Sequence, residues 1–224
     1  MKPTAAILLT GVLCFCGCEI HIEGLDDIGI GSGVRGSGVE ATETRDLPEF
    51  ESIVLKGSGD VTVEIGDEQS VVVEIDDNLL EIIQTKVDDG ELVIDTEKSY
   101  SSKLGLKVRI TMVEFDGIEI SGSGDADVSG IDGGELQFKV NGSGNVNASG
   151  TADEVTIVVN GSGDVNLFKL EASEASVRIA GSGDVDVHAT EELNVRIMGS
   201  GDVTYDGSPQ VEMKVMGSGD VNKK

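Results

Sequence analysis

Acidic and amide side chains recur at two fixed distances after a repeated Gly-Ser-Gly tripeptide. The set that follows each first glycine by three residues comprises Asp60, Asp125, Asn145, Asp164, Asp184, Asp202 and Asp220. A second set, two positions further on, comprises Asp127, Asn147, Asn166, Asp186 and Asn222. Ca²⁺ prefers about six to eight oxygen ligands of these kinds. A Ca²⁺ ladder would therefore be built first on Asp164, Asp184 and Asp202.

The alternative is that these side chains accept hydrogen bonds from backbone amides at the corner and keep the surface soluble. We favour this interpretation, because the sequence GSGDVDV is not the calcium-binding nonapeptide of toxin repeats: its Asp follows the glycines too closely and its period differs. The sequence thus predicts no cofactor, and Ca²⁺ is the cation that needs testing.

Catalytic chemistry is disfavoured by the repetition itself, because a catalytic residue is needed once whereas Asp and Ser recur in every copy. The chain has no Ser-His-Asp or Cys-His set, no HExxH, no GxxxxGK loop and no cysteine after Cys18. The sequence therefore predicts a non-enzyme without catalytic residues. His188, Phe168 and Tyr205 depart from the repeat pattern and mark where a ligand contact would lie, although the two aromatic residues are better explained as packing residues.

A basic column occupies the position three residues before the corner. Its members are Lys139, Arg178, Arg196 and Lys214, with Glu119 and Val158 at the same position of two other copies. Such a stripe could bind a carboxylated glycan. Salt pairing across the corner with the acidic columns is the favoured interpretation, and each exposed pair would contribute about 0–1 kcal/mol.

These side chains must be positioned by a repeating element. The first glycine of the tripeptide stands at Gly57, Gly122, Gly142, Gly161, Gly181, Gly199 and Gly217, with spacings of 18 to 20 residues from Gly122 onward. Apolar residues occupy the positions four and two before this glycine and four and six after it. Alternation with period two on both sides predicts two short strands joined by a tight corner.

Each repeat has the length of one coil of a β-solenoid, in which equivalent residues stack at about 4.8 Å. Isolated hairpins would be only marginally stable and would not require identical corners. We therefore predict an all-β parallel β-solenoid with Gly-Ser-Gly-Asp corners. The glycines would supply positive-φ or crowded positions, and the serine hydroxyls would form a ladder between coils.

The chain divides into four segments on this basis. Residues 1–17 are predicted to be a signal peptide, and 18–45 a lipidated cysteine followed by a flexible tether. Residues 46–115 form an irregular β N-terminal half, which packs coaxially on the regular repeats of 116–224 and caps their first coil, so that 46–224 is one structural domain. Within it, Leu79–Ile83 fits either a strand or a helical turn.

The first 18 residues give the expected address. The apolar run from Ala5 to Leu13 is shorter than the roughly 20 residues that span a bilayer. Phe15-Cys16-Gly17-Cys18 resembles a bacterial lipobox, which implies lipidation of Cys18; an ordinary signal with incidental cysteines is the alternative. Glu19 after the cysteine favours the outer membrane, on its periplasmic or surface face, over retention in the inner membrane.

Composition limits the partners. The net charge of −26 excludes a nucleic-acid binder, because phosphate recognition requires clustered cations. All three cysteines lie at or before Cys18, so the exported part has none with which to form a disulfide. The expected partner is the membrane, through the N-terminal lipid. The sequence assigns no protein or glycan partner.

The segments FESIVLKGSGDVTVEIG, VVVEIDDNLLEIIQTKVDDGELVID, KVRITM and ISGSGDADVSG carry a family likeness. Over about residues 46–222 the chain resembles the auto-transporter adhesin, head GIN domain family of bacteria. The resemblance implies a right-handed β-helix-like domain, often exported and lipid-anchored, and implies no catalytic residues. We therefore expect a non-enzymatic, lipid-anchored cell-envelope protein that presents a rigid acidic solenoid for adhesion or envelope interactions. The alternative is a Ca²⁺-assisted glycan-binding or glycan-cleaving β-helix protein.

Overall fold

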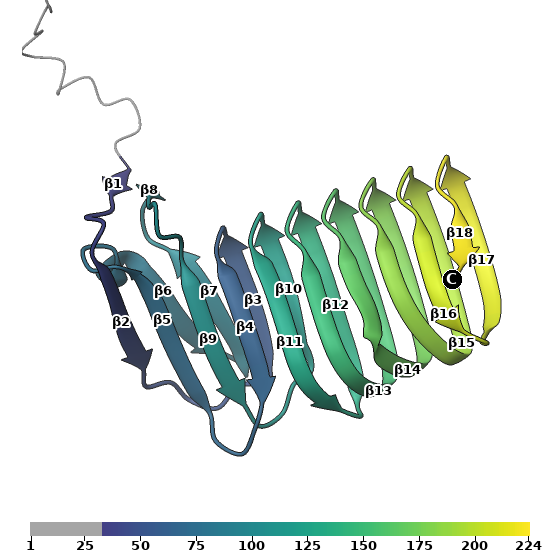
Figure 1. The fold of residues 1–224 in the computed structure, drawn as a ribbon, viewed down its shortest axis with the longest axis horizontal. Helices are drawn as coiled ribbons and strands as arrows, with labels where there is room; N and C mark the ends of the chain where they lie inside the picture. Colours follow the sequence, from purple (N-terminus) through teal and green to yellow (C-terminus); the bar gives the residue numbers. More distant parts are fainter. Residues whose placement is uncertain (1–32) are drawn as a thin grey trace, which may run out of the picture. The chain divides into compact units, whose positions relative to one another are not determined.

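The protein is described by a computed structural model over residues 33–224, which form one compact unit. Stacked coils run along its length, and each coil places one strand before and one strand after a corner (Figure 1). The elements are β1 (Val34–Arg35), β2 (Glu40–Arg45), β3 (Ser52–Gly57), β4 (Asp60–Ile65), β5 (Ser70–Asp76), the 3₁₀ turn η1 (Leu80–Ile82), β6 (Ile83–Asp88), β7 (Glu91–Thr96), β8 (Tyr100–Ser101), β9 (Lys107–Met112), β10 (Gly117–Gly122), β11 (Asp125–Asp132), β12 (Glu135–Gly142), β13 (Val146–Gly161), β14 (Val165–Gly181), β15 (Val185–Gly199), β16 (Val203–Gly207), β17 (Gln210–Gly217) and β18 (Val221–Lys223).

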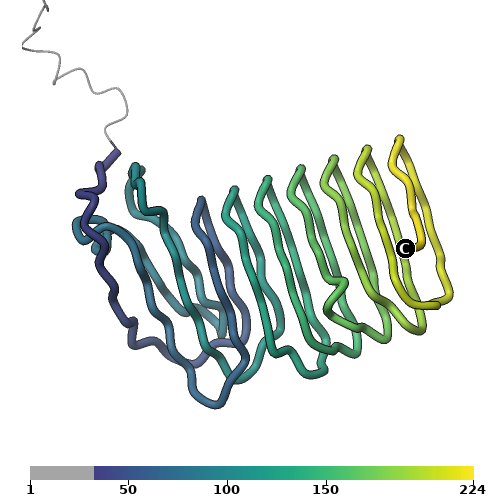
Figure 2. Tube along the Cα trace, in the orientation of Figure 1, coloured from purple at the N-terminus to yellow at the C-terminus, as the bar shows by residue number. Residues whose placement is uncertain are grey.

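The repeats stack in parallel register, as predicted. Gly122 pairs with Gly142, which pairs with Gly161, and the file continues through Gly181 and Gly199 to Gly217. The corners consequently form a row along one edge of the molecule (Figure 2). Residues that are 18 to 20 positions apart therefore lie next to one another, and the β-solenoid is confirmed.

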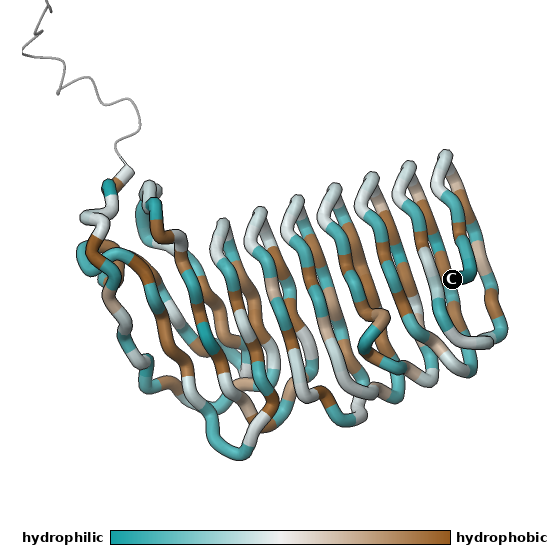
Figure 3. The backbone as a smooth tube through the Cα atoms, viewed as in Figure 1, coloured by the Kyte–Doolittle hydropathy of each residue, from teal (hydrophilic) through white to brown (hydrophobic). Residues whose placement is uncertain are grey.

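The core lies between the two strands of each coil. Along β14, buried Val165 and Leu167 flank exposed Asn166, and the same alternation repeats in the neighbouring coils. Figure 3 shows the resulting bands of apolar residues running from coil to coil and the pale Gly and Ser residues at the corners. Valine, isoleucine and leucine fill most of this narrow interior, which suits branched side chains of strand residues.

Main-chain contacts hold the corners together. The backbone N–H of Ser182 donates to the carbonyl of Gly161 at 2.8 Å, and that of Ser200 donates to Gly181 at 2.9 Å. The same bond recurs at Ser123, Ser143, Ser162 and Ser218. The serines thus lie in a file, as predicted, but the recurring contact uses their backbone N–H rather than the expected hydroxyl ladder. The reason is that backbone approaches backbone at the first glycine of each corner from Gly122 onward.

The N-terminal half extends the same two strand layers. Although residues 66–112 intervene, β3 pairs with β10 and β4 pairs with β11, so the first Gly-Ser-Gly corner stacks directly under the second. On their other side β7 and β9 form a further parallel coil. Antiparallel strands β6, β5 and β2 complete this end. The segment Leu79–Ile83 contains η1, so the helical-turn alternative is the correct one.

The predicted end of the tether at residue 45 is wrong. Glu40–Arg45 forms β2 and pairs antiparallel with β5, and Val34–Arg35 pairs with β8. The prediction failed because β2 is a mostly exposed edge strand, so its sequence EATETR lacks a buried alternating face. The signal peptide at 1–17, Cys18 and the tether residues up to 32 lie outside the described residues.

Asp76 fastens this first segment to the coils. It is almost fully buried, and its carboxylate accepts hydrogen bonds from the hydroxyl of Ser102 and, at 2.6 Å, from the backbone N–H of Gly38. The bond from Ser102, followed by that from Gly38, lowers the pKa of Asp76 despite burial. The carboxylate therefore stays ionised, and it links the end of β5 to the residues that follow β1 and to the residue that follows β8.

Within residues 33–224 the helical content is confined to η1, and no helix there has the length and apolar character needed to cross a bilayer.

Candidate functional site

The first acidic column forms a continuous hydrogen-bonded file. The backbone N–H of Asp184 donates to Oδ1 of Asp164 at 2.8 Å, Asp202 donates to Asp184 at 2.8 Å, and Asp220 donates to Asp202 at 2.8 Å. At the start of the file, the backbone N–H of Asn145 donates to Oδ1 of Asp125 at 2.9 Å. The backbone N–H of Asp164 then donates to Oδ1 of Asn145 at 3.1 Å. Each side chain therefore accepts the amide of the next coil, which is the corner role favoured from the sequence.

The second column runs beside the first. Asn147, Asn166 and Asp186 lie in register, and the file continues through Thr204 to Asn222. The two columns border an open hollow of about 530 Å³. Burial raises the pKa of Asp186, and the negative charges of Asp184 and Asp164 add to this effect. The hollow is thus a negatively charged face whose carboxylates lie in lines.

The three residues proposed for a Ca²⁺ ladder lie in one of these lines. Each of Asp164, Asp184 and Asp202 uses Oδ1 to accept a backbone N–H, so that oxygen is already committed. Among residues 33–224, no group of three or more His, Cys, Asp or Glu side chains converges as a metal site would require. A line of carboxylates supplies oxygens from one side, whereas Ca²⁺ takes ligands from all around.

We expect millimolar Ca²⁺ to leave the melting temperature of the protein unchanged, because a ligand stabilises a fold only in proportion to its occupancy of a native site. Calorimetric melting with Ca²⁺, with Mg²⁺ and with EDTA measures this. A rise specific to Ca²⁺ that is lost in Asp184→Asn would contradict the expectation and establish the ladder.

The basic column is also present, but its pairing differs from the prediction. Lys139, Arg178, Arg196 and Lys214 lie in register, with Glu119 before them and Val158 in between. Nζ of Lys139 lies 2.9 Å from Oε2 of Glu119, so this pair runs along the column and not across the corner. In the described part of the chain, Arg178, Arg196 and Lys214 form no ion pair.

Glu119 is adapted to its role in that pair. Burial opposes ionisation of its carboxyl, but hydrogen bonds from Lys139, Ser121 and Asn141 outweigh the burial and lower its pKa. The paired end of the basic column is therefore neutralised at ordinary pH, whereas the three cations beyond Val158 are not.

The residues that break the repeat do not assemble a site. Nζ of Lys224 lies 4.0 Å from the centre of the Phe168 ring, a cation–π contact. Tyr205 packs against the core, and His188 pairs in register with Asp206. Both aromatic residues are thus engaged in structural contacts, in line with the interpretation favoured from the sequence.

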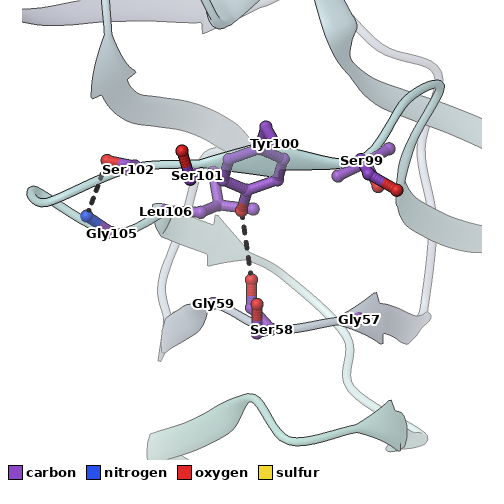
Figure 4. Close-up of a pocket in the computed structure, with 10 residues that line it drawn as sticks. Gly57, Ser58, Gly59, Ser99, Tyr100, Ser101, Ser102, Gly105 and Leu106 are labelled. Carbon is purple, nitrogen blue, oxygen red and sulfur yellow. Dashed lines mark hydrogen bonds between the residues drawn. The ribbon is translucent and has the colours of Figure 1, made fainter. Parts of the chain in front are cut away.

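A serine-lined pocket was missed from the sequence. Between β7 and β9 a long corner replaces the Gly-Ser-Gly tripeptide, and it faces the first true corner at Gly57–Gly59 across a cavity of about 480 Å³ (Figure 4). Tyr100 Oη donates to the carbonyl of Ser58 at 3.3 Å, and burial raises the pKa of this phenol. The stretch Ser99-Tyr100-Ser101-Ser102 could have drawn attention to this pocket, but a sequence pattern of this kind predicts only a turn.

This pocket offers hydroxyl groups without a base to activate them. Its lining includes Ser58, Thr96, Ser99 and Ser101, and no His, Asp, Glu or Lys. The hydroxyl of Ser102 is already used, because it donates to Asp76 and accepts the backbone N–H groups of Leu104 and Gly105 at 3.0 Å. Nucleophilic catalysis needs an adjacent base. The pocket can therefore hold a neutral polar group but does not supply a catalytic set.

A stack of identical corners with long outward columns defines a β-solenoid whose walls are its principal surfaces. The chain belongs to the family described as "Putative auto-transporter adhesin, head GIN domain", which matches residues 49–209. The resemblance noted from the sequence is thereby confirmed.

Solved structures share this fold. A "putative adhesin" from Bacteroides fragilis NCTC 9343 is 22% identical with a TM-score of 0.69, and the match covers 86% of this chain and 100% of that one. A "putative lipid binding protein" from Parabacteroides distasonis ATCC 8503 is 24% identical with a TM-score of 0.59, again over 86% and 100% of the two chains. At these identities the likeness establishes the fold alone. No curated protein matches the chain.

Proposed function

We propose that the protein is a non-enzymatic, lipid-anchored component of the bacterial cell envelope that uses its rigid acidic solenoid for adhesion or envelope interactions. The observation that carries this proposal is the register of the coils, which repeats the same outward residues along the wall. A repeating surface suits a repeating or extended partner. Membership of an adhesin-like family supports a place in the cell envelope.

A physical argument favours binding over catalysis in this proposal. A glycan-cleaving β-helix would need an acidic cluster that departs from the columns, with two carboxyl groups on either side of a bond. Within residues 33–224 the acids of the hollow keep to their columns, and the serine pocket lacks a base. Both observations support a role in binding.

Attachment to the membrane is proposed from the lipobox-like sequence, which lies outside the described residues. A cysteine that carries several acyl chains would hold the protein durably, because each buried methylene contributes about 0.8 kcal/mol. Glu19 supports the outer membrane as the destination. An anchored rigid rod would hold its wall at a fixed place relative to the envelope.

We expect Cys18→Ala to release the protein from the membrane fraction and to abolish incorporation of labelled fatty acid. The matched control is Cys16→Ala, which removes a thiol two positions earlier and keeps the proposed attachment residue. Fractionation of cells that express each variant measures the effect. Membrane retention of the Cys18→Ala variant would refute lipid anchoring at this residue.

A further inference from the structure

Three cations stack on neighbouring strands at the C-terminal end of the solenoid. Arg178 on β14, Arg196 on β15 and Lys214 on β17 lie in register and are all exposed. Neighbouring strands are about 4.8 Å apart, so the backbone positions of the first and third cations are separated by about 10 Å along the solenoid axis. We call these three residues the cation stripe.

The cation stripe lacks the carboxylate partner that the same column has elsewhere. Lys139 is paired with Glu119 at 2.9 Å, whereas none of the three cations has a carboxylate oxygen within 4.0 Å in the described part of the chain. The protein has 42 Asp and Glu against 16 Lys and Arg, so acidic partners are abundant. Like charges stacked one above another repel, and a bound anion would remove that repulsion.

Side chains on one flank of the stripe offer hydrogen bonds. Ser176, Asn194 and Glu212 lie in register two positions before the cations. Together the two rows border a shallow groove of about 160 Å³. Asn194 is oriented by Glu192, to which its Nδ2 donates at 2.7 Å. Glu212 is the carboxylate in the groove itself, so an anion must bind toward the cations and away from that residue.

The other flank is apolar. Two positions after the cations stand Ala180, Met198 and Met216, which are again in register. Met198 and Met216 are 41% and 47% exposed, so two large apolar side chains face solvent on this wall. The surface therefore presents three parallel rows across three coils: a hydrogen-bonding row, a cationic row and an apolar row.

We propose that the cation stripe binds a linear acidic polysaccharide whose sugar carboxylates recur along the chain. This inference rests on the proposed adhesive function and names its ligand class. Each row matches one part of such a glycan: carboxylates pair with the cations, hydroxyls bond to Ser176 and Asn194, and the C–H face of the sugar ring lies on the methionines. The three cations follow one another along the solenoid axis, so a linear glycan that lies along this axis contacts more than one of them.

The identity of the cations suits a carboxylate ligand. Two of the three are arginines, whose planar guanidinium binds a carboxylate through two parallel hydrogen bonds. The charge of −26 repels densely charged polyanions, whereas a glycan with one charge per sugar is repelled less. Salt screens the distant acids over about 8 Å at physiological ionic strength, so the nearby stripe dominates contact with the ligand.

Calorimetric titration of the full chain with polygalacturonate tests the proposal, with dextran as the neutral probe and inorganic polyphosphate as the alternative anion. We expect binding of polygalacturonate that weakens with added salt, no binding of dextran, and weaker binding of polyphosphate. The triple variant Arg178→Gln, Arg196→Gln, Lys214→Gln should lose affinity at least about tenfold, a loss that corresponds to about 1.4 kcal/mol.

The matched control is Lys86→Gln, Lys98→Gln, Lys103→Gln, which removes the same charge from exposed positions outside the stripe. Its affinity should stay within about twofold of the unmodified protein. No binding of polygalacturonate, equal loss in both triple variants, or tighter binding of polyphosphate would overturn the proposal. Should the first triple variant not fold, the single variant Arg196→Gln carries the same comparison against Lys98→Gln. Anchoring through Cys18 plays no part in this measurement, so the two proposals fail separately.

Discussion

Replacing Gly181 by alanine should destabilise the solenoid by about 2–6 kcal/mol, the sum of two effects of about 1–3 kcal/mol each. The first effect is backbone strain, because Gly181 has φ of +149°, which side chains with a Cβ rarely adopt. The second is steric: a Cβ at this position would lie 1.9 Å from the carbonyl oxygen of Gly161 in the neighbouring coil. That oxygen belongs to the backbone and accepts the N–H of Ser182, so it cannot move aside without opening the corner.

Two further glycines separate these effects. Gly57 occupies the same corner position with φ of +94°, but a Cβ there meets nothing within 4 Å, so Gly57→Ala should show only the strain. Gly183 has no positive φ, yet its Cβ would lie 2.0 Å from the carbonyl oxygen of Gly163, so Gly183→Ala should show only the clash. Urea denaturation of residues 33–224 measures all three. If Gly57→Ala and Gly181→Ala lowered the free energy of unfolding equally, close stacking of the corners would not contribute to the cost of a Cβ at Gly181.

The same glycines explain why the fold could be predicted. A corner that repeats its backbone shape in every coil requires the same residues each time, so the contact between coils is written into the sequence as Gly-Ser-Gly. Inward positions such as Val177, Ile179, Val185 and Val187 are indeed buried. Period and alternation together define which residues stack and which face outward. These are local properties, and a single sequence contains them.

Long-range pairing was not predictable in the same way. The Gly-Ser-Gly motif at Gly57 predicted that residues 46–115 pack coaxially on the first regular coil, but the local pattern does not show that residues 66–112 fold on the other side of β3 and β4. The polar edge strand β2 and the serine corner at residues 97–106 were likewise missed. Both depend on which segment happens to lie beside them. Edge strands in particular can be polar on both faces, so hydrophobic periodicity does not reveal them.

The surface columns were predicted better than their partners. Period-two alternation identifies each outward position, and the structure places those side chains in files as expected. The choice of partner depends on geometry: Lys139 reaches Glu119 in the adjacent strand, and not an acid across the corner. Val158 then interrupts the column, so the cations beyond it have no equivalent carboxylate. Salt pairs that the sequence allows are therefore a weak guide to those that form.

Phe138→Ala is expected to destabilise the protein by about 3–5 kcal/mol, the range for removing a buried phenylalanine. Phe138 is fully buried and stands in register between Ile118 and Ile157. Its ring centre lies 6.1 Å from that of Phe115, so the two rings pack against each other at the start of the regular repeats. The coils on both sides are fixed by their corners and cannot collapse into the space, which places the expected loss toward the upper end of the range.

The matched control is Phe168→Ala, because this ring is only partly buried and its described contact is with Lys224 at 4.0 Å. Loss of an exposed cation–π contact removes about 0.5–1 kcal/mol. Urea denaturation at constant temperature compares the two variants. The dependence of the free energy of unfolding on urea concentration should be the same for both, because unfolding exposes the same surface. If Phe138→Ala were no more destabilising than Phe168→Ala, the interior between the coils would have to be loosely packed. The stacked coils could then not be the rigid wall on which the proposed binding of a repeating partner depends.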